Sequence, residues 1–110
     1  MVVNAINSYE EFQTAINSGK PVLIDFFTPE CVPCKPVSGA LEILSKRAEY
    51  TGVDFYKVNV HEQEKISNEL GVRFVPTFIL FKDGDKVSDL VGANPRKLPA
   101  LVEQASGLVA

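Results

Sequence analysis

Two cysteines are the residues of this chain whose type and spacing are best suited to chemistry. Only Val32 and Pro33 separate Cys31 from Cys34, and the chain has no other cysteine. Two intervening residues allow the sulfurs to meet in a disulfide. A bridge across so short a loop removes little entropy from the unfolded chain, so it would add little stability. We therefore interpret the pair as a reversible dithiol–disulfide rather than as a structural crosslink.

The pair lies where an apolar strand pattern ends and a helical pattern begins. The run 22–27 is apolar except for Asp25, and helical periodicity continues after Cys34. Backbone N–H groups at a helix N-terminus stabilise negative charge and so lower the pKa of a thiol there. Cys31 is predicted to attack a substrate disulfide and form a mixed disulfide. Cys34, one turn further on and more buried, is predicted to attack Cys31 and release the substrate, with Pro33 stiffening the link.

Two other interpretations of the pair are unrelated buried thiols and half of a metal site. A structural zinc site takes four ligands, whereas this chain offers one histidine, His61, besides the two cysteines. His61 precedes Glu62 in a polar stretch and is expected to be a solvated surface residue. Because only a dimer would bring four cysteines together, no metal is predicted.

Asp25 is the second residue whose position suggests chemistry. A carboxylate inside an apolar strand is desolvated, which raises its pKa. Such a group, six positions before Cys31, is predicted to take the proton of Cys34 through a water molecule. The alternative is an aspartate that satisfies a buried backbone donor. Lys57, flanked by apolar residues, either pairs with Asp25 or extends its ammonium group to solvent.

Val75 and Pro76 stand just before an apolar strand pattern. A proline there either marks the start of an edge strand or forms a cis peptide bond. A cis bond would present the Val75 backbone to a partner. Sequence periodicity does not decide between these two alternatives.

The segments that must position these residues alternate between the hydrophobic pattern of a strand and that of a helix. Strand patterns cover residues 2–6, 22–27, 55–60, 78–82 and 86–91. Helical patterns run from a capping box at Ser8 to Gly19, from the cysteines through Ala48, over 62–70, and from near Leu98 onward. This order predicts an α/β fold: a mixed sheet of about five strands, with four helices on both faces and an antiparallel hairpin at one edge. Pro36 is expected either to cost a helical hydrogen bond or to shift where the regular helix starts.

Composition narrows the class of protein. The 110 residues are 45% hydrophobic and 23% charged, with a formal net charge of −3, as expected for one domain spanning 1–110. No basic stripe indicates nucleic-acid binding, and no apolar run is long enough to cross a membrane. The first residues lack a signal-peptide pattern, so a cytoplasmic location is expected, with a removed leader as the alternative. The chain is expected to be monomeric or weakly dimeric.

Nearly the whole chain resembles the thioredoxin family. The matching stretches, in family order and spacing, are VLIDFF, CVPCK, DFYKVNV, ELGVRFVPTFILFKDG and LVGANP. The resemblance implies a thioredoxin fold and the reduction of protein disulfides. It implies no bound cofactor; electrons come ultimately from NADPH through thioredoxin reductase.

The resemblance also implies residue roles. Cys31 matches the attacking cysteine, Cys34 the resolving cysteine, Asp25 the buried acid, Lys57 its lysine partner, and Pro76 the cis-proline facing the cysteines. The implied substrate groove consists of Glu30, Val32, Pro33, Phe74, Val75, Pro76, Gly92 and Ala93. Val75 would offer its backbone to an extended substrate segment.

The chain departs from the usual W-C-G-P-C of the family. Glu30 replaces the tryptophan, Val32 replaces the glycine, and Phe74 is bulkier than the residue often found there. A carboxylate beside Cys31 disfavours its thiolate, by about one pKa unit at a separation of ~4 Å in water. We therefore predict a raised Cys31 pKa, slower attack at pH 7 and an altered partner set. Gly39 stands where the family has a helix-kinking proline.

Two rival functions remain open on the same scaffold. One is a disulfide isomerase or oxidant, which a redox potential near or above that of glutathione would indicate. The other is a thioredoxin-fold binding module with little turnover, which would fail to reduce insulin with any donor. Retention of both cysteines and Asp25 favours the reductase.

Overall fold

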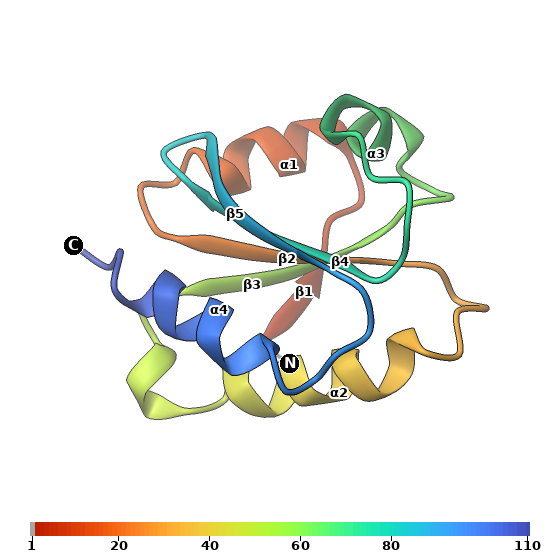
Figure 1. Cartoon of the computed structure of the whole chain (residues 1–110). Coiled ribbons are helices and arrows are strands. Elements are labelled where there is room, and N and C mark those ends of the chain that lie inside the picture. Colours follow the sequence, from red (N-terminus) through yellow and green to blue (C-terminus); the bar gives the residue numbers. More distant parts are fainter. Residues whose placement is uncertain (1) are drawn as a thin grey trace.

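The computed structural model of the chain describes residues 2–110 (Figure 1). Met1, which the predicted single domain includes, lies outside the described residues. The elements in chain order are β1 (Val3–Ala5), α1 (Tyr9–Ile16), β2 (Val22–Phe27), α2 (Cys34–Ser45), a 3₁₀ turn (Ala48–Tyr50), β3 (Asp54–Asn59), α3 (Glu64–Leu70), β4 (Thr77–Lys82), β5 (Asp85–Val91) and α4 (Leu98–Ser106). The predicted order of strands and helices is therefore confirmed.

One mixed sheet organises the chain, with the strand order β1-β3-β2-β4-β5. Neighbours β1, β3 and β2 are parallel, whereas β4 is antiparallel to β2 and to β5. The central strand is β2, and the side chains of its first five residues are buried because helices cover both faces. The predicted antiparallel hairpin at one edge is confirmed by β4 and β5, which meet at Asp83 and Gly84.

Helices α1 and α3 cover one face of the sheet, and α2 and α4 cover the other (Figure 1). Successive side chains of a strand point to opposite faces, so β2 contributes side chains to two separate hydrophobic cores. Ile24 packs with Phe12 and Ile66 under α1 and α3, while Leu23 packs with Leu41 under α2 and α4. Asp25 follows the alternation onto the α2 face, and this places its carboxylate near the helix that carries the cysteines.

The ends of two helices differ from the prediction. The first helix ends at Ile16 rather than Gly19, because Asn17, with φ −103° and ψ 13°, leaves the helical conformation. Gly19, with φ +88°, lies in the turn that leads to β2. The second helix ends at Ser45, and Ala48 begins the separate 3₁₀ turn instead of continuing it.

The third helix begins at Glu64, not at residue 62. The side-chain oxygen of Asn59 accepts hydrogen bonds from the backbone N–H groups of His61 and Glu62, at 3.0 and 3.3 Å. These bonds hold the two residues in a turn after β3. Each predicted strand differs from the observed one by no more than one residue at either end, which is the usual precision of such assignments.

The two prolines near helix starts cost no helical hydrogen bond. Helix α2 begins at Cys34, so Pro36 is its third residue, where a backbone N–H has no partner within the helix. Helix α4 begins at Leu98 with Pro99 next, which confirms the predicted start. Within residues 2–110, no helix combines the length and apolar character needed to cross a membrane.

Candidate active site

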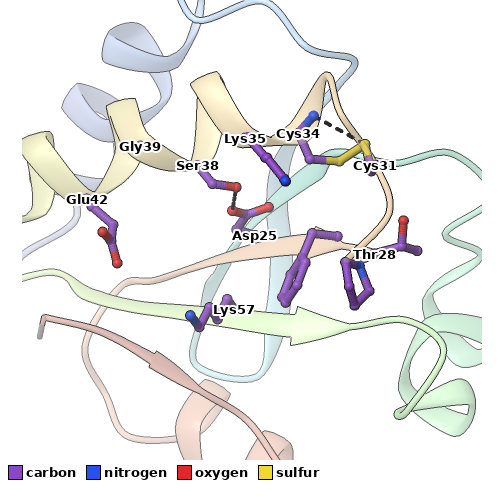
Figure 2. A pocket seen from close by; sticks show the side chains of 11 residues that line it. Asp25, Thr28, Cys31, Cys34, Lys35, Ser38, Gly39, Glu42 and Lys57 are labelled. Atoms are coloured by element: carbon purple, nitrogen blue, oxygen red, sulfur yellow. Dashed lines mark hydrogen bonds between the residues drawn. A yellow bond between two sulfur atoms is a disulfide. The ribbon is translucent and has the colours of Figure 1, made fainter.

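The two cysteines form a disulfide on the loop between β2 and α2 (Figure 2). Their Cα atoms are 5.3 Å apart. Cys34, the first residue of α2, has an exposed fraction of only 2%, whereas Cys31 is half-buried. An incoming reagent therefore meets the sulfur of Cys31 before that of Cys34.

The helix N-terminus acts directly on the more exposed sulfur. The backbone N–H of Cys34 donates a hydrogen bond to Sγ of Cys31, with a donor–acceptor distance of 3.2 Å. This N–H is one of the first-turn donors that have no partner inside the helix. When the disulfide is reduced, the same donor and the helix dipole favour negative charge on Cys31. The predicted location of the pair at a helix N-terminus is confirmed.

The loop before β4 faces the disulfide. The peptide bond between Val75 and Pro76 is cis, which decides the question that sequence periodicity left open. The carbonyl oxygen of Val75 lies 4.0 Å from Sγ of Cys31. The backbone N–H of Gly92 donates to the carbonyl oxygen of Pro76 at 2.9 Å, and this holds the two loops together. Gly92 adopts φ +108°, a conformation that favours glycine.

Asp25 lies beneath the disulfide with its carboxylate bound on one side only. The hydroxyl of Ser38 donates to Oδ2 at 2.6 Å, and Oδ1 has no hydrogen-bond partner among residues 2–110. Desolvation raises the pKa of Asp25 to about 6, and the Ser38 hydrogen bond and the Lys57 charge oppose that rise. The predicted elevation is confirmed. A buried acid that titrates near neutral pH is suited to exchange protons.

A cavity of about 370 Å³ connects the acid with the disulfide (Figure 2). Its walls include Asp25, Cys31, Cys34, Ser38, Glu42 and Lys57. The volume holds several water molecules, and the polar groups on its walls can bind them. The cavity therefore joins Cys34 and Asp25 by a space that water can occupy.

Lys57 on β3 is the register partner of Asp25 on β2. Its side chain is half-buried, and its positive charge lowers the pKa of Asp25. Within the described part of the chain, the ammonium group forms no ion pair of 4.0 Å or less. The structure thus brings the two residues close without the direct pairing that the sequence left as one alternative.

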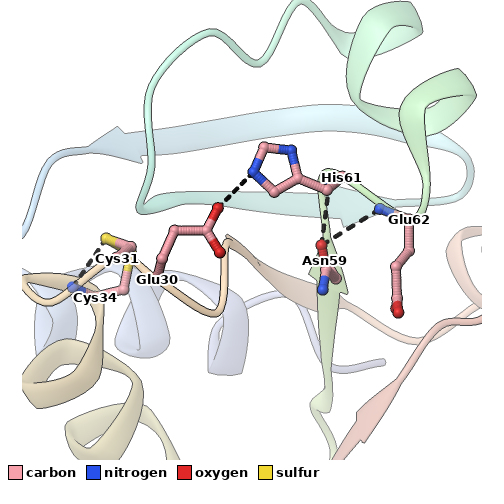
Figure 3. A network of polar contacts seen from close by, with 6 residues as sticks. All are labelled: Glu30, Cys31, Cys34, Asn59, His61 and Glu62. Atoms are coloured by element: carbon pink, nitrogen blue, oxygen red, sulfur yellow. Dashed lines mark hydrogen bonds and ion pairs between the residues drawn. A yellow bond between two sulfur atoms is a disulfide. The ribbon is translucent and has the colours of Figure 1, made fainter.

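A polar contact borders the site on the side opposite the helix start (Figure 3). Nε2 of His61 lies 2.7 Å from Oε1 of Glu30, and both side chains are exposed. The prediction that His61 is exposed is confirmed, but its contact with Glu30 was not predicted. The two residues are 31 positions apart in the sequence. Parallel pairing of Phe27 with Asn59 brings the ends of β2 and β3 together, and the sequence alone does not specify that register.

Two large apolar side chains near the disulfide are exposed to solvent. Val32 is 73% exposed and Phe74 is 70% exposed. The carbonyl oxygen of Phe74 accepts a hydrogen bond from the Thr77 hydroxyl at 2.6 Å, which fixes the loop. Of the other predicted groove residues, Pro33 and Ala93 are exposed and Pro76 is buried.

Ser38 is the residue near the cysteines that the sequence analysis missed. It follows Cys34 by four positions on α2, and residues so spaced share one face of a helix. That spacing was readable from the sequence. Nowhere in residues 2–110 do three or more His, Cys, Asp or Glu side chains gather in a way that could hold a metal ion.

Comparison with known proteins agrees with this geometry. Residues 3–104 match the family model described as Thioredoxin. The thioredoxin of Malassezia sympodialis is 42% identical over 104 residues, which cover 94% of this chain and 99% of the relative. Its crystal structure superposes with a TM-score of 0.91 over 94% of this chain and 90% of that one. The oxidised mitochondrial thioredoxin 3 of Saccharomyces cerevisiae, 32% identical, has a TM-score of 0.85 and covers 93% and 94% of the two chains.

The fold expected from the resemblance is therefore confirmed, as is the redox character of the cysteine pair. Proteins of this kind carry electrons between thiols and disulfides and take part in cell redox homeostasis. The chain belongs to the thioredoxin family, and it is a thiol–disulfide oxidoreductase that reduces protein disulfides by dithiol–disulfide exchange at Cys31 and Cys34.

Proposed function

We propose that Cys31 is the attacking cysteine and Cys34 the resolving cysteine. The single observation that carries this assignment is the 3.2 Å hydrogen bond from the Cys34 N–H to Sγ of Cys31, which stabilises a thiolate on Cys31. Greater exposure of Cys31 supports the same order. Its thiolate attacks one sulfur of the substrate disulfide, and the other substrate sulfur leaves as a thiolate.

Asp25 is the proton acceptor for the second step. Cys34 loses its proton to Asp25 through water in the cavity, and its sulfur then attacks Sγ of Cys31. The mixed disulfide breaks, the Cys31–Cys34 bond forms, and the substrate leaves as a second thiolate that takes a proton from solvent. Substrate gains two electrons and the cysteine pair loses two. Lys57 favours the ionised carboxylate by its charge, which supports Asp25 as a base.

The substrate is an extended segment of a disulfide-containing protein. The backbone carbonyl of Val75, 4.0 Å from Sγ of Cys31, supports strand-like pairing with such a segment. Exposed Val32 and Phe74 supply apolar contacts, while Gly92 and Ala93 leave room on the neighbouring loop. Glu30 adds a negative charge at the rim and disfavours acidic partners.

The electron donor is thioredoxin reductase, which draws its electrons from NADPH. The protein works in the cytoplasm as a monomer or a weak dimer. Each chain forms a single domain that spans residues 1–110. Family membership supports this donor. The cytosol keeps thiols reduced, and the disulfides that form there are usually transient and catalytic, which supports a cytoplasmic location for this cysteine pair.

Insulin reduction tests the reductase activity, the electron donor and the roles of the two cysteines. The wild-type chain is expected to reduce insulin with dithiothreitol and with NADPH plus thioredoxin reductase. Activity with dithiothreitol alone would overturn the proposed donor. The cysteine roles are tested by incubating each Cys→Ser variant with insulin: Cys34→Ser is expected to accumulate a covalent adduct and Cys31→Ser none. The reverse pattern would exchange the two roles.

A further inference from the structure

Ser38 connects the helix of the cysteines to the buried acid. Cys34 and Ser38 are one turn apart on α2, and both side chains face β2 (Figure 2). The hydroxyl of Ser38 donates to Oδ2 of Asp25 at 2.6 Å, a distance typical of a hydrogen bond from a hydroxyl to an ionised carboxylate. This contact is the only hydrogen bond to the carboxylate among the described residues.

The bond makes the two oxygens of Asp25 unequal. Oδ2 is occupied by the Ser38 hydroxyl, whereas Oδ1 is buried without a hydrogen-bond partner in residues 2–110. Burying a carboxylate oxygen without a donor costs free energy, and a catalytic role is one reason why a protein keeps such a group. The cavity that Asp25 lines also reaches Cys34, whose thiol must lose a proton in the resolving step.

We propose that Ser38 is a positioning residue for disulfide exchange: it holds Oδ2 of Asp25 so that Oδ1 stays directed to receive the Cys34 proton. The inference rests on the proposed role of Asp25 as proton acceptor. The step balances as before, since the proton moves from Cys34 through water to Oδ1, and the Cys34 sulfur then displaces the substrate sulfur from Cys31. Ser38 itself keeps its proton and favours the ionised carboxylate.

Other charged groups that face Asp25 act on the same equilibrium. Lys57 on β3 lowers the pKa of the acid, in the same direction as Ser38. Lys35 and Glu42 on α2 also line the cavity, with opposite charges. On the remaining side, β4 presents the apolar Phe78 as the register partner. Ser38 is thus the neutral donor to a carboxylate whose other neighbours act through space.

A purely structural role for Ser38 would predict a loss of stability and no change in the pH dependence of the chemistry. The experiment therefore follows the resolving step alone. Reduced protein reacts with 5,5′-dithiobis(2-nitrobenzoate): the first thiolate is released by Cys31, and the second when Cys34 resolves the mixed disulfide. The rate of the second phase is recorded between pH 5 and pH 9.

Ser38→Ala is expected to move the acidic limb of this profile upward by about one pH unit, because a hydrogen bond to the ionised carboxylate is lost. The second phase then slows about tenfold at pH 5 and converges with wild type above pH 8. Ser38→Thr keeps a hydroxyl and is expected to retain the wild-type profile, whereas Ser38→Val, which has the shape of threonine without the hydroxyl, is expected to shift it. If the alanine variant fails to fold, the Thr and Val pair decides the question alone. An unshifted limb in both Ala and Val overturns the inference.

Two controls separate this inference from the function on which it rests. Ser45→Ala removes the hydroxyl of a second serine on α2, which is buried and donates to the Glu42 carbonyl, and its profile is expected to match wild type. A shift in Ser45→Ala would mean that any loss on α2 moves the limb, and would overturn the assignment to Ser38. Asp25→Asn is expected to abolish the limb. If the limb persists, Asp25 is not the acceptor; if it disappears while Ser38→Ala matches wild type, only the role of Ser38 fails.

Discussion

Glu30 and His61 face each other across the rim of the active site, with Oε1 of Glu30 2.7 Å from Nε2 of His61. Figure 3 shows the carboxylate turned toward the imidazole and away from the Cys31 sulfur. A carboxylate only accepts hydrogen bonds, so Nε2 of His61 carries the hydrogen. The charge of Glu30 is therefore partly compensated, and its effect on Cys31 is weaker than the sequence alone predicted.

The first prediction concerns the pKa of Cys31 in the reduced protein. His61→Ala is expected to raise it, because the released carboxylate destabilises the thiolate, and Glu30→Gln is expected to lower it. Each change should be less than about one pH unit, since both groups are exposed and screened. Thiolate absorbance against pH gives the value. Glu62→Gln, which removes a carboxylate next to His61, serves as the control.

If neither His61→Ala nor Glu30→Gln changes the pKa of Cys31, the contact does not influence this thiol. The double variant adds a sharper comparison. Once Glu30 is neutral, removal of His61 should have little further effect, because His61 acts on the thiolate through that carboxylate. Equal effects of His61→Ala in both backgrounds would mean that the imidazole acts on Cys31 directly.

The second prediction concerns Phe74, whose exposed ring is expected to contact protein substrates. Phe74→Ala is expected to raise the KM for insulin about fivefold, the change that loss of one apolar anchor produces at an interface. The rate with a small aliphatic disulfide should change much less, because such a reagent buries little surface against the protein. Val87→Ala is the control, since Val87 is also exposed but lies toward the far end of β5. An equal rise in KM for both variants would refute a specific role of Phe74.

The sequence was sufficient for the fold because its signals are local. Alternating and helical periods, the Asp83-Gly84 turn and the apolar run around Asp25 each depend on neighbouring residues. The stop of the first helix was misplaced because Gly19 is a strong terminator, but the chain had already turned at Asn17. A glycine such as Gly19 therefore limits how far a helix can extend, but it does not identify the last helical residue.

Contacts between elements were the part that the sequence did not provide. Glu30 meets His61 only because β2 and β3 pair in one particular parallel register. Ser38 meets Asp25 only because α2 is rotated so that its Cys34 face lies over β2. Strand register and helix rotation depend on packing of the whole core, so a single sequence rarely specifies them.

The third prediction uses two glycines with equal space and different backbones. A Cβ atom added to Gly39 or to Gly71 would meet nothing within 4 Å. Gly39 lies inside α2, where alanine is favoured by about 0.5–1 kcal/mol, so Gly39→Ala is expected to raise Tm by roughly 2–8 °C. Gly71 has φ +68°, so Gly71→Ala is expected to lower Tm through backbone strain. Thermal unfolding of the oxidised protein measures both. A lower Tm for Gly39→Ala would contradict the prediction.

The fourth prediction concerns the cost in stability of keeping Asp25 buried. Its pKa of about 6 in the folded protein exceeds the ordinary value of 3.8, so the folded chain binds the proton more tightly than the unfolded chain. Stability should therefore fall as pH rises from near 4 to near 6 and change no further through this group above that range. The full effect at neutral pH is about 3 kcal/mol, since each pKa unit corresponds to about 1.4 kcal/mol.

Asp25→Asn removes this titration while preserving an oxygen that can accept from Ser38. The variant is expected to be more stable than wild type at pH 7.5 and to lose most of that advantage at pH 4, where the wild-type carboxyl is neutral. Urea unfolding of the oxidised proteins at the two pH values measures the difference. Asp54→Asn, at the exposed Lys20 contact, is the control and should show a much smaller change, because exposed ion pairs contribute little. A pH-independent advantage for Asp25→Asn would show that the gain does not come from the charge, and would contradict the raised pKa on which the proton transfer to Asp25 depends.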